Sequence, residues 1–215
     1  MDYISHIKAI TSEIIFCCLS DIKYAFCFLA ITISRPVAVL FTVYCLMWIV
    51  SFVDSGVVED DQHAQVIYQK ITLTALVGVA ICLPIVGWVS DKYGPHITIP
   101  LSFVIRALVL MSFLTIKKPD SYFSYAMCSI IIISSAMQAS SIDALFLKSI
   151  PKEIRGAMVG TYNMFANVGT LLFTYYGGPA FDKIGPASPF IMIACGDWLV
   201  FLLAIILAIF GVLKS

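Results

Sequence analysis

The sequence predicts an all-α integral membrane protein, folded as a six-transmembrane-helix bundle made of two inverted three-helix repeats. Three observations lead to this fold class. The chain of 215 residues is 60% hydrophobic and only 12% charged, with a mean hydropathy of +0.98, whereas a water-soluble domain is about 25% charged. Six apolar runs are each long enough to cross a bilayer, and a charged nine-residue turn occurs twice.

The chain divides into a short N-terminal segment, residues 1–20, and a membrane bundle, residues 21–215. In the first segment isoleucines recur at helical spacing, which predicts an amphipathic helix at the membrane interface; a frayed terminus is the alternative. The first span is long and contains Pro36, which predicts a kink. We expect the six transmembrane helices at residues 24–53, 70–90, 96–116, 121–147, 156–179 and 188–213.

Lysines and arginines predict the orientation, because they are enriched in cytoplasmic loops. With the N-terminus in the cytoplasm, seven basic residues lie inside and four lie outside. Both termini are therefore expected to be cytoplasmic, in a membrane that the sequence does not specify. The inner set is Lys8, Lys23, Lys92, Lys148, Lys152, Arg155 and Lys214, and the outer set is Lys70, Lys117, Lys118 and Lys183.

Composition argues against several other classes of protein. The 13 basic and 13 acidic residues cancel, and no basic patch predicts a nucleic-acid partner. The seven cysteines lie in or beside apolar runs without a C-x-x-C pair, which is typical of small buried residues and not of a disulfide framework or metal site. G-x-S-x-G and H-E-x-x-H motifs are absent from the sequence, so we expect neither an enzyme nor a cofactor.

The repeated turn is GWVSDKYGP at residues 87–95 and GPAFDKIGP at residues 178–186, identical at five of nine positions. Three predicted spans separate the copies, so they are expected on opposite membrane faces. A three-helix unit repeated with inverted topology gives this pattern, which is typical of secondary transporters; coincidence is the alternative. The glycines allow a tight turn, and the aspartate can accept hydrogen bonds from backbone N–H groups.

The first turn resembles the loop motif of the major facilitator superfamily, which is glycine, three residues, aspartate, a basic residue, any residue and glycine. That family carries the motif after the second helix of each half. Pro95 and His96 stand where the family pattern usually continues with basic residues. The segment before the fifth run resembles the family's entry into helix eleven, and the second turn resembles its exit. The resemblance marks a gating motif of Gly87, Asp91, Lys92, Gly94, Arg155, Gly156, Gly178, Asp182, Lys183 and Gly185.

The resemblance covers nearly the whole chain and matches the C-terminal six helices of a twelve-helix transporter. It implies half of a secondary active transporter that moves a small solute by alternating access. The implied partners are a small-molecule substrate, membrane lipid and a second six-helix half, either an N-terminal half or a second copy. The alternative is a non-transporting membrane scaffold or accessory subunit derived from a transporter half.

Four ionisable residues lie well inside the predicted spans, where a charge costs about 2.5–3.5 kcal/mol or more unless it finds a partner or water. Arg35 is expected to bind an anionic substrate, because the resemblance implies that its helix lines the central cavity of the transporter. Asp143 is expected to act as the counter-ion of Arg35 or as a proton carrier. A salt bridge that only orients two helices is the alternative. Arg106 and Asp197 are expected to form a structural pair, because the family places their helices outside the cavity.

Polar residues also form a stripe on the fourth and fifth runs. Asn163 and Asn167 are four residues apart and share a helix face. These side chains are expected to line the substrate path, although polar groups can also simply hold membrane helices together. The candidate substrate-binding or coupling residues are Arg35, Gln138, Asp143, Tyr162, Asn163 and Asn167.

Overall fold

The structure, a computed structural model, describes residues 21–213. All regular secondary structure in this range is helical. The interfacial helix predicted for residues 1–20 lies outside the described residues.

The first predicted run is a single helical path with a break in the middle. It consists of α2 (Ile22–Ser34), α3 (Val37–Val39), the π-helical η1 (Leu40–Tyr44) and α4 (Cys45–Asp54). The helix breaks at Pro36, because proline has no N–H to donate to the preceding turn and its ring crowds that turn. The regular helix is thus interrupted at the residue where the sequence predicts a kink.

The remaining runs form five long helices. They are α5 (Asp61–Tyr93), α6 (Pro95–Ser112), α7 (Tyr122–Ser149), α8 (Arg155–Ile184) and α9 (Ser188–Ile209). The start of α5 lies well before the predicted residue 70, because Asp60 caps the helix by accepting a hydrogen bond from the His63 N–H at 2.6 Å. A capped polar turn can extend a helix beyond its apolar run.

Five helical segments of the described range are both long and apolar enough to cross a membrane: the broken first run, α5, α6, α7 and α9. The chain is therefore a multi-pass membrane protein. The fifth predicted span, residues 156–179, corresponds to α8, which has 30 residues but is not among these five. It carries Asn163, Asn167 and several glycines, which lower its apolarity.

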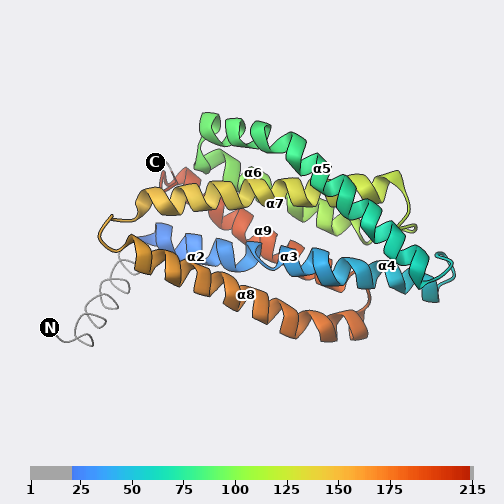
Figure 1. Ribbon diagram of the computed structural model, residues 1–215. Coiled ribbons are helices and arrows are strands. Elements are labelled where there is room, and N and C mark those ends of the chain that lie inside the picture. Colours follow the sequence, from blue (N-terminus) through green and yellow to red (C-terminus); the bar gives the residue numbers. More distant parts are fainter. Residues whose placement is uncertain (1–20, 214–215) are drawn as a thin grey trace.

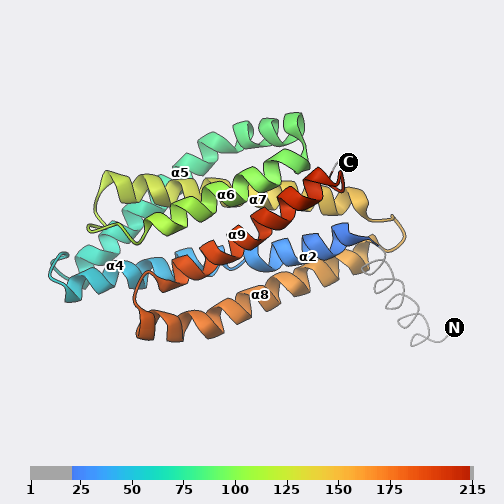
Figure 2. The same ribbon diagram turned by 180° about the vertical axis from the view of Figure 1, so that it is seen from behind.

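The helices form two layers (Figure 1). In the first layer α5 packs on α7, α7 on α2, and α2 on α8, which leaves α5 and α8 at the two edges. In the second layer α6 and α9 pack on each other and cover the first layer from behind (Figure 2). The broken first run and α7 therefore lie centrally, with neighbours on both sides and behind.

Apolar side chains pack in two separate clusters toward the two ends of the bundle. One is centred on Trp48, with Phe113 stacked on Phe190 at 4.2 Å between ring centroids. The other includes Phe28, with Phe146 stacked on Tyr162 at 4.3 Å. Between them along the helices lies a polar layer, which we define as Ser34, Arg35, Arg106, Ser135, Gln138 and Asp197.

Candidate functional site

Arg35 lies at the break between α2 and α3, and its side chain is exposed. It borders a cavity of about 340 Å³ whose lining comes from the broken first run and α7. Within residues 21–213 the guanidinium has no hydrogen-bonded or ion-paired partner. A cation in the middle of a membrane-spanning run, next to a cavity and without a hydrogen bond or ion pair in the described residues, is available to a ligand or to water.

Gln138 is fully buried in α7, behind this cavity. Its Oε1 accepts a hydrogen bond from the Ser34 hydroxyl at 3.0 Å. Its Nε2 is buried and makes no hydrogen bond within the described residues. A buried amide with an unpaired donor costs about 1–3 kcal/mol, which marks this position as unusual.

Asp143 is half-buried and accepts a hydrogen bond from the Tyr162 hydroxyl at 2.7 Å. Tyr162 is in turn held by its stacking on Phe146. No ion pair joins Asp143 to Arg35 in the described part of the chain, where the two ion pairs are Arg106–Asp197 and Glu59–His63. The salt bridge between Arg35 and Asp143, considered above as the alternative to substrate binding, is therefore not formed, and the Asp143 carboxylate is hydrogen-bonded to Tyr162 instead.

Asn163 and Asn167 are both exposed on α8. The Asn163 amide donates to the Val159 carbonyl of its own helix at 3.0 Å. The two asparagines belong to a longer exposed face of small and polar residues, spaced at helical intervals, that sequence reasoning recognised only in part. Its other exposed members are Gly156, Gly160 and Thr174.

Arg106 and Asp197 form the expected pair between α6 and α9. Both side chains are fully buried, and Arg106 binds the carboxylate through two nitrogens, with Nε–Oδ2 2.7 Å and Nη2–Oδ1 2.5 Å. Its third nitrogen, Nη1, donates to the Ser135 hydroxyl at 3.3 Å. Because Ser135 lines the cavity beside Arg35, the buried pair is connected to the cavity wall.

The first copy of the repeated turn ends α5. Gly94 has φ +73°, which favours glycine, and its N–H donates to the Ser90 carbonyl at 3.0 Å. Lys92 lies over the Trp88 ring at 4.5 Å from the centroid, a cation–π contact. Gly87 and Asp91 line a separate cavity of about 280 Å³ against the last turns of α7, where Ser90 and Ser141 hydroxyls are 3.3 Å apart.

The second copy likewise ends α8 at a positive-φ glycine. Gly185 has φ +135°, and its N–H donates to the Ala180 carbonyl at 3.4 Å. Gly178, Asp182 and Lys183 all belong to the last two turns of α8, and the two charged residues are exposed. The C-terminal ends of α5 and α8 lie at opposite ends of the bundle (Figure 1).

The remaining gating residues lie at the start of α8. Arg155 is the first residue of that helix, and its Nη2 donates to the Leu147 carbonyl of α7 at 3.5 Å. Gly156 is exposed, with open space where a side chain would be. The described residues therefore leave this end of α8 accessible.

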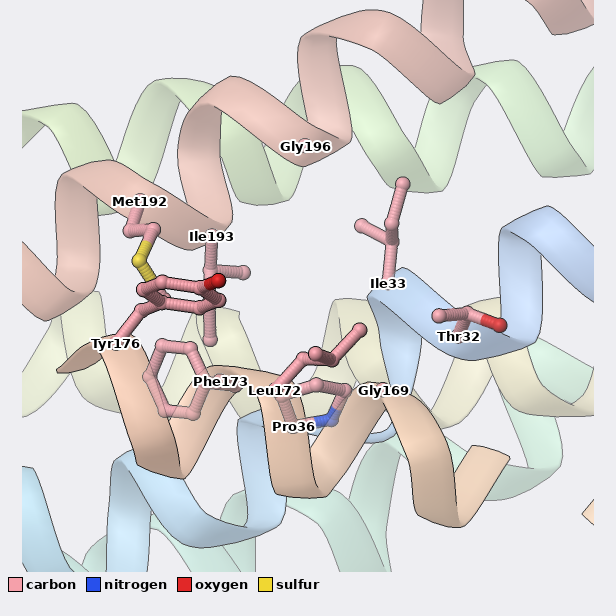
Figure 3. A pocket seen from close by; sticks show the side chains of 10 residues that line it. All are labelled: Thr32, Ile33, Pro36, Gly169, Leu172, Phe173, Tyr176, Met192, Ile193 and Gly196. Atoms are coloured by element: carbon pink, nitrogen blue, oxygen red, sulfur yellow. The ribbon is translucent and has the colours of Figure 1, made fainter. Parts of the chain in front are cut away.

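A third hollow, of about 220 Å³, lies between α2, α8 and α9. Figure 3 shows Phe173 and Tyr176 from α8 and Met192 and Ile193 from α9 around it, with Pro36 at the break below. Its walls are almost entirely apolar. The hollow contrasts with the Arg35 cavity, which carries a cation and hydroxyl groups.

Comparison with known families identifies the architecture. A sequence model of the Major Facilitator Superfamily matches residues 37–214. The chain belongs to the major facilitator superfamily. This membership agrees with the two-layer helical bundle and with the turn motif after α5, and it makes the protein a member of a transporter-type family.

The chain is also similar in sequence to magnetosome proteins of two bacteria. Over 171 residues the chain is 24% identical to the magnetosome protein MamH of Paramagnetospirillum magneticum, covering 78% of this chain and 38% of MamH. Over 190 residues it is 26% identical to MamZ of the same organism, covering 86% of this chain and 29% of MamZ. MamZ of Magnetospirillum gryphiswaldense is also 26% identical over 190 residues, with 28% of its length covered. The chain thus spans well under half the length of these relatives.

Proposed function

We propose that this chain is half of a secondary active transporter of the major facilitator type, moving a small organic anion by alternating access. The observation that carries the proposal is Arg35, an exposed arginine at a helix break beside a cavity, with no hydrogen bond or ion pair in the described range. An arginine that served only to join two helices would be paired, as Arg106 is. A free guanidinium suits an incoming carboxylate or phosphate.

The second half of the transporter is expected to dock on the first layer. α5 and α8, at its edges, expose large apolar side chains and, on α8, the face of small residues that begins at Gly156. Small residues allow close approach of membrane helices. The docked half is an N-terminal half or a second copy, and it would enclose Arg35, Asn163 and Asn167 in a central path.

Asp143 and Gln138 have supporting roles in this proposal. Asp143, bound to the Tyr162 hydroxyl, can exchange a proton with the central path, because it is only half-buried. Gln138 holds Ser34 next to Arg35. The two copies of the repeated turn, each ending at a positive-φ glycine and lying at opposite ends of the bundle, support the proposal of inverted three-helix repeats.

The second candidate function is a membrane scaffold or accessory subunit. It is favoured by the complete burial of the Arg106–Asp197 pair and by the pairing of Asp143 with Tyr162, since a scaffold would satisfy its charges internally. Arg35 discriminates between the two functions, because a scaffold needs no free cation beside a cavity.

The test is uptake of labelled organic anions into proteoliposomes that contain the protein in the form in which it purifies, with any bound partner. Arg35→Ala should abolish uptake, and Arg35→Lys should restore it only in part, because lysine keeps the charge but loses the planar fork. Lys117→Ala is the control, since that exposed lysine lies outside both the cavity and the gating motif. Full uptake by Arg35→Ala would remove Arg35 from the transport path, and loss of folding would favour the scaffold.

A further inference from the structure

The cavity beside Arg35 carries two hydroxyl groups as well as the guanidinium. Ser34 belongs to the last turn of α2 and Ser135 to the middle of α7, and both line the cavity. Among the described residues that line it, none is acidic. One cation and two hydroxyl donors, with no carboxylate, form an environment that suits an anion and disfavours a cation.

Ser135 is held from behind by a buried cation. Its hydroxyl oxygen accepts from Arg106 Nη1 at 3.3 Å and its proton is donated to the Ile131 carbonyl at 2.6 Å. The Ser134 hydroxyl also donates to that carbonyl, at 2.9 Å. The Ser135 proton can therefore turn toward a ligand without leaving Ile131 unpaired, and the donation from Arg106 strengthens it as a donor.

Ser34 is held in the same manner by Gln138. In the structure the Ser34 proton points to Gln138 Oε1, and the buried Nε2 has no partner within residues 21–213. A half-turn of the amide exchanges its two ends, so that Nε2 donates to the Ser34 oxygen and the Ser34 proton is free. Each amide orientation leaves one buried group unpaired, so an anion that accepts from Ser34 selects the second orientation.

We infer that the cavity is an oxyanion site in which the guanidinium of Arg35 and the hydroxyls of Ser34 and Ser135 bind one carboxylate, with Gln138 and Arg106 as positioning residues. The inference rests on the proposed transport function and assigns its substrate class. The rest of the lining is apolar, including Ile31, Phe41 and Ile132. The occupant is accordingly a small carboxylate with an apolar body, since a bare inorganic anion would leave this apolar wall in water.

The experiment measures binding to the purified chain in lipid nanodiscs, by calorimetry or ligand-observed NMR. Three probes separate the contributions: benzoate has the carboxylate and an apolar body, benzyl alcohol keeps the apolar body without the charge, and inorganic phosphate has only the oxyanion. We expect benzoate to bind at least tenfold more tightly than either of the others. Equal affinity for benzoate and benzyl alcohol, or no binding of benzoate, would overturn the inference.

Serine variants test the two hydroxyls. Ser34→Ala and Ser135→Ala should each weaken benzoate binding about five- to tenfold and leave benzyl alcohol unchanged, because a hydrogen bond to a charged group is lost. Ser129→Ala is the matched control. Ser129 lies on α7, as Ser135 does, and its hydroxyl donates to the Tyr125 carbonyl one turn earlier at 2.8 Å, but it is outside the cavity. Unchanged benzoate affinity in both alanine variants would refute the site. If Ser135→Ala fails to fold, Ser135→Cys replaces it, and unchanged benzoate affinity there would count against the site equally, because a thiol is a weak donor.

The positioning role of Gln138 has its own readout. In Gln138→Glu the ionised carboxylate can only accept from Ser34, so that hydroxyl is no longer available to a ligand, and a negative charge is added. Benzoate affinity should fall at least tenfold while benzyl alcohol affinity stays constant; a purely structural role would lower both together.

The outcomes also separate this inference from the proposed function. Serine-dependent benzoate binding without any transport would overturn the transport proposal and keep the site. Transport of organic anions that is indifferent to Ser34→Ala and Ser135→Ala would keep the transporter and overturn the site.

Discussion

At the scale of single residues, the two intramembrane arginines are accommodated in opposite ways. Arg106 is fully buried, with two nitrogens on Asp197 and the third on Ser135. Arg35, in contrast, lies at a helix break, and its side chain is exposed beside a cavity. The difference is physical evidence for different roles: a buried cation must be neutralised where it lies, whereas a cation in contact with water need not be.

The first prediction concerns the buried pair. Asp197→Asn should lower the free energy of unfolding by about 3–5 kcal/mol, because Arg106 is left as an uncompensated buried charge. Thermal denaturation in detergent, followed by circular dichroism, measures the change. The double variant Arg106→Met/Asp197→Leu should recover most of the loss, since apolar groups of similar volume need no partner.

The control for this prediction is the exposed pair of Glu59 and His63, 3.8 Å apart. Glu59→Gln should leave the melting temperature almost unchanged, because solvent screens exposed pairs. Equal stability of Asp197→Asn and the unmodified chain would show that the Arg106 charge is compensated elsewhere.

The residues of the polar layer show what the sequence could predict and what it could not. The Arg106–Asp197 pair was predicted correctly, because two opposite charges at similar depth in a membrane have few other solutions. Ser34 and Ser135 were missed: serine is common in membrane helices, and only the folded structure reveals that each is backed by a buried donor or acceptor. The sequence did carry one signal for these serines, which is their position: each lies well inside its apolar run, away from the ends.

At the scale of helices, α2 and α8 cross closely at Thr32, next to Pro36 on the first run and Gly169 on α8. Pro36 cannot supply the N–H that the Thr32 carbonyl would receive in a regular helix. Gly169 of α8 lies so close that a Cβ there would be 2.0 Å from the Thr32 oxygen. The Thr32 hydroxyl also bridges to the Phe165 carbonyl of α8 at 3.3 Å. The close contact between α2 and α8 is therefore located directly before the break at Pro36, and it requires a glycine at position 169.

The second prediction tests this crossing. Gly169→Ala should destabilise the fold by about 1–3 kcal/mol or more, because α2 and α8 must separate to admit the methyl group. Gly160→Ala is the matched control on the same helix, where a Cβ meets nothing within 4 Å. A melting temperature for Gly169→Ala equal to that of Gly160→Ala would contradict the close crossing.

Helix type and order were predictable from apolar run length, but helix ends were not. α5 extends to Asp61 through a turn rich in glutamine and charge, because Asp60 caps it, and α8 continues to Ile184 past its apolar part. Charged residues at such ends lie outside the hydrocarbon core, where helical structure needs no apolar composition. The break at Pro36 was predicted, but the π-helical turn at Leu40–Tyr44 has no local sequence signal.

At the scale of the whole molecule, the two ends of the bundle differ in charge. One end has Lys23, Lys92, Lys148, Lys152 and Arg155 in or beside its helix termini and loops. The other end has only the basic residues Lys117, Lys118 and Lys183, together with the acidic stretch Glu59–Asp61. This asymmetry is the physical basis for expecting the first end in the cytoplasm.

The third prediction tests this orientation. Single cysteines introduced at Glu59 and at Lys152, in a background without other cysteines, should react with a membrane-impermeant maleimide from opposite sides of sealed vesicles. Lys152→Cys should be labelled only from the cytoplasmic side. Labelling of both positions from one side would contradict the proposed topology.

The buried ion pair also constrains how the chain is made. Arg106 and Asp197 are 91 residues apart, so α6 leaves the ribosome well before its counter-charge exists. At about 5–20 residues per second the delay is roughly 5–18 s. During that time Ser135, 29 residues later, is the first of the Arg106 partners to be synthesised. Membrane insertion of α6 is thus provisional until α9 is translated. In a nascent chain truncated after Gly185, α6 should therefore insert less completely than in the full chain, which glycosylation mapping of the two chains would reveal.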